Sequence, residues 1–261
     1  MSEDRSPETR LSARAVYQTV RYDGEQEMAR PVGSLWWSGV AAGIALASSV
    51  VAKGLLHMEL PDTPWRAPIA DIGYCVGFVL VVLGRMQLFT ENTITVVLPL
   101  MAKPSWRGLY CTSRLWTVVF VANMVGTFIA ALFVNMAGVD APNQLHAFNE
   151  VAAQGVLGSD WVGNMLRAIP AGFFVAALVW MLPNARGFEI WVIMLPTYII
   201  ALGGFAHVVV GSMEVWLLIL AGQLGVVDGL WGFVAPALLG NVLGGTVLFS
   251  LLAYGQVRRE I

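Results

Sequence analysis

Charged side chains are scarce in this chain of 261 residues. Lys, Arg, Asp and Glu together make up 12% of it, whereas a soluble domain carries about 25%. Apolar residues account for 57%, and the mean hydropathy is +0.69. This composition excludes an ordinary soluble domain and predicts a polytopic membrane protein. The net charge of −2 provides no basic surface, so nucleic acid is not an expected partner.

Cysteine and histidine are also rare, with two and three copies. Cys75 and Cys111 lie in or near apolar runs, so neither a structural disulfide nor a metal site is predicted. The chain has no nucleotide-binding loop and no nucleophile constellation, so we expect no cofactor and no catalytic residue. The first thirty residues contain no apolar stretch typical of a signal peptide, and the first span is therefore expected to direct insertion.

The uncharged runs predict the domain organisation. Residues 1–30 are expected to form a cytoplasmic arm with an amphipathic helix that is capped at Ser6 and lies on the membrane surface; a solvated tail is the alternative. Residues 31–261 are expected to form a transmembrane channel domain with repeats at 31–138 and 160–257. Apolar segments are predicted at 34–52, 67–84, 94–102, 115–138, 168–185, 190–204, 215–227 and 229–257, and a loop at 136–160.

Two of the six predicted spans are expected to be broken. Segment 94–102 is too short to cross a bilayer, which needs about 20 residues, so it is paired with 67–84 as the second span. The fifth span is interrupted around His207, with Ser212 capping the restart and Glu214 in its first turn. In the second span, Thr90 or Asn92 is expected to provide the cap. Transporters build polar sites at such breaks, where an ionisable residue is a candidate functional residue.

Arg85 stands at the end of the apolar run 67–84. A charged residue at membrane depth costs at least ~2.5 kcal/mol. An ion pair with Glu91 is expected to lower that cost, although a purely structural or snorkelling arginine is the alternative.

An Asn-x-x-Gly pattern occurs once in each half, as Asn123 with Gly126 and as Asn241 with Gly244. Small residues at this spacing let helices approach closely. Each half has three spans, and an odd number requires the second half to be inverted. We therefore predict an all-α membrane protein of six transmembrane helices, arranged as two inverted three-helix repeats with helices 2 and 5 broken.

The distribution of Lys and Arg predicts the orientation. With the N-terminus inside, eleven of these residues fall in cytoplasmic segments and two, Lys53 and Arg66, fall outside. Both termini are therefore expected to be cytoplasmic.

These motifs together resemble the formate/nitrite transporter family. Leu88-Phe89-Thr90 is similar to that family's loop in the broken second helix, and Gly204-Phe205-Ala206-His207 is similar to its Gly-Phe-x-His in the fifth. The resemblance covers the chain from about residue 30 onwards. It implies an aquaporin-like fold, a homopentamer in a bacterial cytoplasmic (inner) membrane, and passage of formate, nitrite, hydrosulfide or their conjugate acids.

The resemblance also implies roles for single residues. His207 corresponds to the central pore histidine, Thr90 to its partner, and Leu88, Phe89 and Phe205 to the narrow region. The match has gaps, because the family's glutamate before Leu-Phe-Thr is Gln87 here, its later asparagines are Gly211 and Gly172, and its lysine has no counterpart near Val156. Arg85 and Glu91 add charges, and Arg85 is expected to replace that lysine as the anion attractor.

The free-energy costs of moving an anion and of protonating it favour a proton-assisted mechanism. A bare anion in a low-dielectric constriction faces tens of kcal/mol in the Born limit. Protonating a carboxylate of pKa about 4 at pH 7 costs only ~4 kcal/mol. We therefore expect a proton to be loaded at or near His207, because histidine titrates near neutral pH.

Three other interpretations stay open from the sequence. In the first, His207 is a buried histidine that only joins the broken helices. A pore for neutral small solutes is the second, although the Asn-Pro-Ala boxes of water channels are absent. A non-conducting membrane sensor or enzyme is the third.

Overall fold

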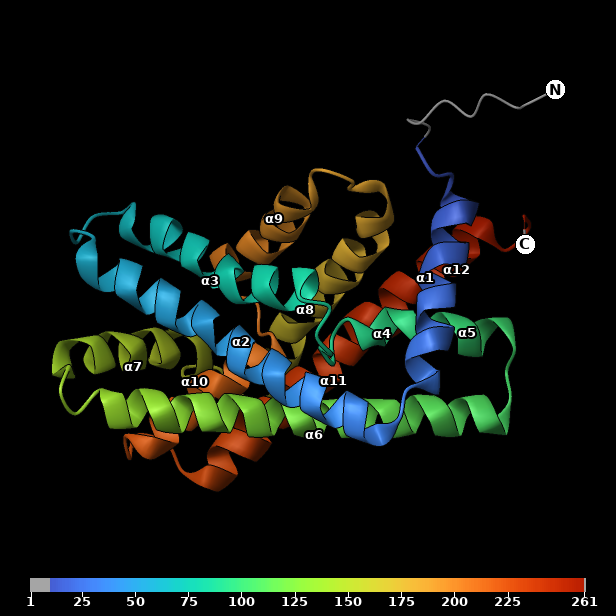
Figure 1. Cartoon of the computed structure of the whole chain (residues 1–261). Coiled ribbons are helices and arrows are strands. Elements are labelled where there is room, and N and C mark those ends of the chain that lie inside the picture. Colours follow the sequence, from blue (N-terminus) through green and yellow to red (C-terminus); the bar gives the residue numbers. More distant parts are fainter. Residues whose placement is uncertain (1–9, 261) are drawn as a thin grey trace.

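The computed structural model describes residues 10–260, and within this range the chain is helical with no strand (Figure 1). The helices are α1 (Ala13–Ala29), α2 (Val32–Glu59), α3 (Arg66–Leu83), α4 (Asn92–Thr95), α5 (Val97–Ala102), α6 (Trp106–Ala137), α7 (Pro142–Val156), α8 (Trp161–Met181), η1 (Leu182–Asn184), α9 (Glu189–Leu202), α10 (Val208–Leu220), η2 (Asp228–Val234), α11 (Ala235–Val242), η3 (Leu243–Ser250) and α12 (Leu251–Val257). The last four form one continuous rod, in which η2 and η3 are π-helical.

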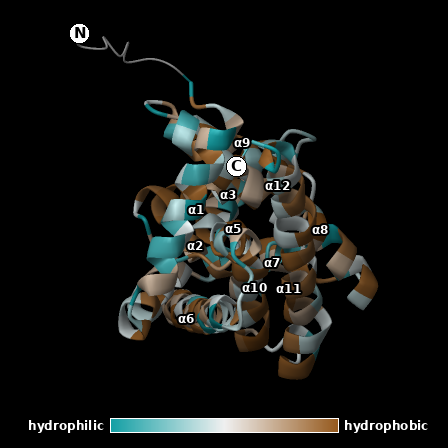
Figure 2. Cartoon of the chain, turned by 90° about the vertical axis from the view of Figure 1, so that its right-hand side faces the viewer, coloured by the Kyte–Doolittle hydropathy of each residue, from teal (hydrophilic) through white to brown (hydrophobic). Residues whose placement is uncertain are grey.

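Five helical segments in the described part of the chain are long and apolar enough to cross a membrane. They are α2, α3, α6, α8 continued through η1, and the rod from η2 to α12. Three shorter apolar segments accompany them, namely residues 92–102, α9 and α10. Figure 2 shows hydrophobic residues along α6, α8 and α11, whereas hydrophilic residues gather on α1. The chain is therefore an all-helical membrane protein.

Two buried asparagines occupy matching positions in the two halves. Asn123 of α6 accepts from the backbone N–H of Phe89 (2.9 Å) and donates to the carbonyls of Gly39 and Gln87. Asn241 of α11 accepts from the N–H of Val208 (2.9 Å) and donates to two carbonyls in the same way, those of Ala168 and Ala206. Each side chain thus fixes the residues at a helix break onto a neighbouring long helix.

The glycines of the two motifs also lie at close helix contacts. A Cβ on Gly126 would lie 2.9 Å from the Cα of Gly43, so only glycine lets α6 approach α2 at this point. A Cβ on Gly244 would collide with the carbonyl oxygen of Ile169 in α8. The long helices of each half therefore meet through backbone rather than side chains.

The predicted loop at 136–160 is wrong, because residues 142–156 form α7. Pro142 occupies the first turn, where its missing N–H costs nothing. Phe148, Val151 and Ala152 are buried where α7 packs against α2 and α10. The helical spacing of these apolar residues was visible in the sequence.

The N-terminal amphipathic helix begins later than expected. The predicted cap at Ser6 lies outside the described residues, and α1 begins at Ala13 with Ser12 accepting from the N–H of Ala15. Val16 and Tyr17 are buried, because the apolar face packs against α5 and α12 (Figure 1). This face contacts protein instead of lying open to the membrane surface.

Both breaks begin with the same backbone turn. Helix α3 has Gly84 as its C-cap, followed by Arg85 with φ of 53°, while α9 has Gly203 as its C-cap, followed by Gly204 with φ of 59°. In each turn the next N–H bonds back across the helix end, from Met86 to Val81 (3.0 Å) and from Phe205 to Ile200 (2.9 Å). This is a Schellman ending, in which glycine is the usual left-handed residue.

The left-handed conformation at Arg85 gives a stability prediction. An L-residue with a side chain costs about 1–2 kcal/mol in this region, so Arg85→Gly is expected to raise the thermal midpoint in detergent slightly. The matched change Gly204→Ala should lower it by a comparable amount. A lower midpoint for Arg85→Gly would mean that contacts of the arginine side chain outweigh the backbone strain.

The restart of the fifth helix differs from the expected one. Helix α10 begins at Val208 with His207 as its N-cap, and Ser212 lies inside the helix, where it bonds to Thr127 (2.9 Å). Glu214 is likewise inside α10 and not in its first turn. Helix α4 begins at Asn92 without any side-chain cap, so the predicted capping by Thr90 or Asn92 is also wrong.

Candidate functional site

Two cavities lie at opposite ends of α3. The α1-side cavity, of about 390 Å³, is lined by residues of α1, the C-terminal end of α3 and the first break, and includes Glu27, Gln87 and Glu91. The α7-side cavity, of about 240 Å³, is lined by the N-terminal end of α3, by α7 and by the second break, and includes His207 and Glu214. The two breaks meet between them.

The junction of the breaks is a hydrogen bond from one half of the chain to the other. His207 Nε2 lies 2.8 Å from Thr90 Oγ1, and both residues are buried, with 2% and 0% exposed. His207 Nδ1 accepts the N–H of Val210 (3.3 Å), as the cap of α10. Because Nδ1 accepts, Nε2 carries the proton of the neutral ring and donates it to Thr90. The threonine hydroxyl is then free to donate its own proton.

Apolar groups surround this polar pair. Phe78 lies with its ring 5.0 Å from the ring of His207, centroid to centroid, and is fully buried. Leu88 is fully buried as well, between Gln87 at the α1-side cavity and Thr90. The layer between the cavities is therefore apolar around one imidazole and one hydroxyl, and we call it the dry layer.

The sequence-predicted narrow residues do not all face this layer. Phe89 packs edge-on against Phe120 and Trp116 of α6 (5.2 and 5.8 Å), so its ring points into the helix core. Phe205 is partly exposed and lines the α7-side cavity. Leu88, Thr90 and His207 are brought together, whereas Phe89 is not.

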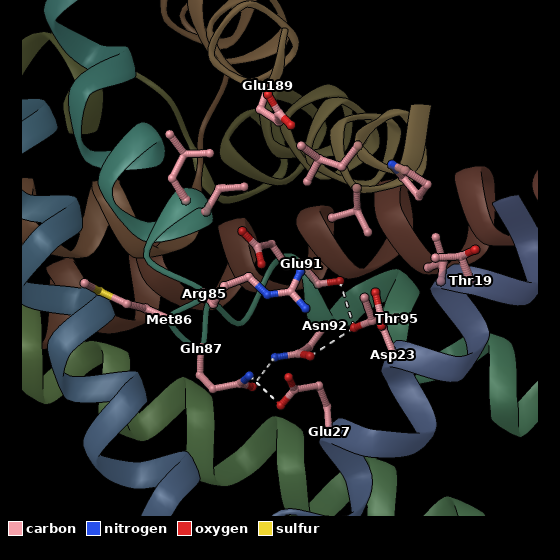
Figure 3. A pocket seen from close by; sticks show the side chains of 16 residues that line it. Thr19, Asp23, Glu27, Arg85, Met86, Gln87, Glu91, Asn92, Thr95 and Glu189 are labelled. Atoms are coloured by element: carbon pink, nitrogen blue, oxygen red, sulfur yellow. Dashed lines mark hydrogen bonds between the residues drawn. The ribbon is translucent and has the colours of Figure 1, made fainter. Parts of the chain in front are cut away.

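Carboxylates dominate the α1-side cavity (Figure 3). Asp23, Glu27, Glu91 and Glu189 line it together with Arg85, and Arg30 forms an ion pair with Glu27 (2.9 Å). Glu27 accepts from Gln87 Nε2 (2.7 Å), and Gln87 Oε1 accepts from Asn92 (3.1 Å). Glu27 of α1 thus places a carboxylate next to Gln87, which stands where the family has a glutamate.

Arg85 and Glu91 do not form the predicted ion pair. Both line the α1-side cavity, but no ion pair within 4.0 Å joins them in the part of the chain that the structure describes. Arg85 is exposed, and Figure 3 shows its guanidinium pointing into the cavity. The expected burial cost does not arise, because this arginine faces an open cavity.

The cations of the α7-side cavity were missed by sequence reasoning. Lys53 forms an ion pair with Asp71 (2.7 Å). Arg167 bonds to the carbonyls of Gly204 (2.8 Å) and Gly155 (3.2 Å). Arg167 therefore ties the second break to α7, in the segment just before Val156. The sequence has no lysine near Val156, and the structure places the guanidinium of Arg167 beside this segment, whereas Arg85 lines the α1-side cavity.

Comparisons with known proteins agree with this architecture. The family model described as Formate/nitrite transporter matches residues 14–255. The chain belongs to the formate/nitrite transporter family, whose members are channels and transporters, so it is a transport protein and not an enzyme.

Individual relatives are similar over most of their length. The Inner membrane protein YfdC of Escherichia coli (strain K12) is 39% identical over 268 residues, which cover 100% of this chain and 83% of that protein. A solved structure titled FNT family ion channel has a TM-score of 0.80 at 18% identity and covers 92% of this chain and 98% of that one. Another, titled Pentameric formate channel with formate bound, has a TM-score of 0.73 at 21% identity, with 87% and 98% covered.

Proposed function

We propose that this protein is a membrane channel for small monovalent anions such as formate, nitrite or hydrosulfide, which cross the narrow layer as their conjugate acids. The observation that carries the proposal is the pair of cavities separated by one dry layer with a single polar pair, Thr90 and His207. Membership of a family of channels and transporters supports it. The solute passes through each protomer.

The matching hydrogen bonds of Asn123 and Asn241 support the inverted repeat. In this arrangement α3 with α4–α5 is the broken second span, and α9 with α10 the broken fifth. We further propose a homopentamer in the bacterial inner membrane, with both termini cytoplasmic. The pentameric structural neighbour and the inner membrane relative support the first two points, and the bias of Lys and Arg supports the third. The α1-side cavity is then cytoplasmic.

Proton loading follows from the electrostatics of the two cavities. Arg167, which has no ion-pair partner among residues 10–260, attracts an anion into the α7-side cavity, where Lys53 is paired with Asp71. In the α1-side cavity Glu27 is paired with Arg30, and the three other carboxylates, against Arg85, repel an anion. A neutral acid crosses both the dry layer and the acidic cavity without these penalties. Thr90, whose hydroxyl is held by His207, provides a hydrogen bond to the solute as it passes.

A pore for neutral solutes is the second candidate, and the acidic α1-side cavity favours it. Solute selectivity separates the two. In proteoliposomes, we expect formate and nitrite to equilibrate at least about tenfold faster than in empty liposomes, whereas glycerol and urea should not. Fast glycerol flux with no formate flux would overturn the anion proposal and favour the neutral pore.

A further inference from the structure

Glu214 is a buried acid that lines the α7-side cavity. The solute passage proposed for Thr90 and His207 gives it no role. Its side chain lines the cavity although the residue is only 8% exposed. Among residues 10–260, no hydrogen-bond donor and no ion-pair partner contacts its carboxylate. An ionised carboxylate in this position has given up part of its hydration without gaining a protein partner. A structural acid is normally satisfied by a donor, so this group needs another explanation.

Glu214 lies on the same helix and the same cavity wall as His207. Seven residues separate the two, so both lie on one face of α10, about 10 Å apart along its axis. Both line the same cavity. A solute that moves from the cavity towards the dry layer therefore passes the carboxyl group before it reaches the imidazole.

Helix α7 contacts this carboxyl group at Gly155, and we call this contact the seat of Glu214. A Cβ on Gly155 would lie 2.5 Å from Glu214 Oε2, so a larger residue there would displace the carboxylate from this position. The carbonyl of the same glycine accepts from Arg167 (3.2 Å). The anion-attracting cation and the acid are thus held on two sides of one residue.

We propose that Glu214 is the proton-exchanging group that protonates the permeant anion in the α7-side cavity. This inference rests on the proposed function and names the residue that performs its proton step. The O–H bond of the Glu214 carboxylic acid breaks as an O–H bond forms on the anion, which leaves neutral solute and a Glu214 carboxylate. The carboxylate then takes a proton from hydronium in the cavity. Formic acid and a glutamic acid side chain are both carboxylic acids, so the transfer is nearly balanced in free energy.

His207 is less suited to this step. Its Nδ1 is engaged as the cap of α10, and its Nε2 is bonded to Thr90. Donating a proton from Nε2 and regaining one would require both bonds to rearrange. His207 instead holds the Thr90 hydroxyl, which is free to donate a hydrogen bond to the neutral acid.

Other ionisable groups share the cavity and shape its pH dependence. Those lining it are Lys53 and His57 of α2, Asp71 and Tyr74 of α3, Arg167 of α8, and the capping His207. Lys53 is paired with Asp71, and α6, α7, η2 and α11, which also pack against α10, add no ionisable side chain to the described lining. Glu214 is the acid of this cavity that has no ion-pair partner within residues 10–260.

The test measures formate uptake and the accompanying proton uptake in proteoliposomes between about pH 5.5 and about pH 7.5. In Glu214→Gln, uptake at the higher pH should fall at least about tenfold and the proton signal with it. The loss should be much smaller at the lower pH, where bulk formic acid is more abundant. Glu214→Asp should retain part of the activity. The control Glu150→Gln removes a half-exposed carboxylate of α7 outside the cavity and should behave as wild type.

A second variant tests the seat without removing the acid. Gly155→Ala should displace the carboxylate and reduce uptake at the higher pH less than Glu214→Gln does, with the same change in pH profile. Wild-type formate flux together with an unchanged pH profile in Glu214→Gln would overturn this inference alone. A uniform loss at every pH in pentameric, folded Glu214→Gln would also overturn it. A wild type that moves no anion would overturn the proposed function and this inference together.

Discussion

Replacing His207 with alanine is expected to reduce formate uptake at least about tenfold. The change removes the hydrogen bond from His207 Nε2 to Thr90, which joins the two halves of the chain at the dry layer. It also removes the N-cap of α10, which is worth about 1 kcal/mol. Uptake of labelled formate into proteoliposomes, normalised to pentameric protein, measures the effect.

A matched variant separates the pore role of this histidine from its capping role. Asparagine is a good N-cap, so His207→Asn should keep the thermal midpoint close to that of wild type while formate uptake stays low. Thr90→Val should lower uptake without altering the cap, because only the hydroxyl partner is lost. If His207→Asn transports formate as well as wild type, the imidazole only joins the two breaks, and the proposed role in solute passage is wrong.

Replacing Asn241 with leucine is expected to produce the largest loss of stability, about 2–5 kcal/mol. The buried amide accepts from Val208 and donates to Ala206, and neither backbone group has a helical partner at the break. Both groups would be left unsatisfied. Because the same bonds position His207, uptake should fall as well. Thermal unfolding followed by circular dichroism in detergent measures the stability.

The equivalent change at Asn123 should cost a similar amount, because that side chain makes the same three kinds of bond around Phe89. Asn135→Leu on α6 is the control, since this partly exposed amide makes no hydrogen bond within the described residues. A midpoint for Asn241→Leu equal to that of the control would contradict the role of the asparagines in holding the breaks.

The sequence predicted the centre of the site better than its surroundings. The pairing of His207 with Thr90 was anticipated, because glycines and polar residues interrupt long apolar runs at both places and because the motifs resemble a known family. The cap of α10 was misplaced, since serine is the commoner cap and histidine caps only through a particular backbone conformation. That conformation depends on Asn241, which is 34 residues away.

The α7-side cavity was not predictable from local patterns. Lys53, Arg167 and Glu214 come from three helices, and only the packing of those helices brings them together. Helix α7 was mistaken for a loop because its proline, asparagines and acid suggested a turn, although its apolar residues repeat at helical spacing. Arg85 was expected at membrane depth because an apolar run precedes it, whereas the left-handed turn directs it into the α1-side cavity.

The most direct test of the central claim is uptake of labelled formate by wild-type proteoliposomes at about pH 7.5 and about pH 5.5, with empty liposomes alongside. Formic acid becomes tenfold more abundant with each pH unit, so protein-dependent uptake should rise at least about tenfold at the lower pH and carry a proton with each formate. Uptake that is independent of pH, or an anion current without proton movement, would contradict passage as the neutral acid.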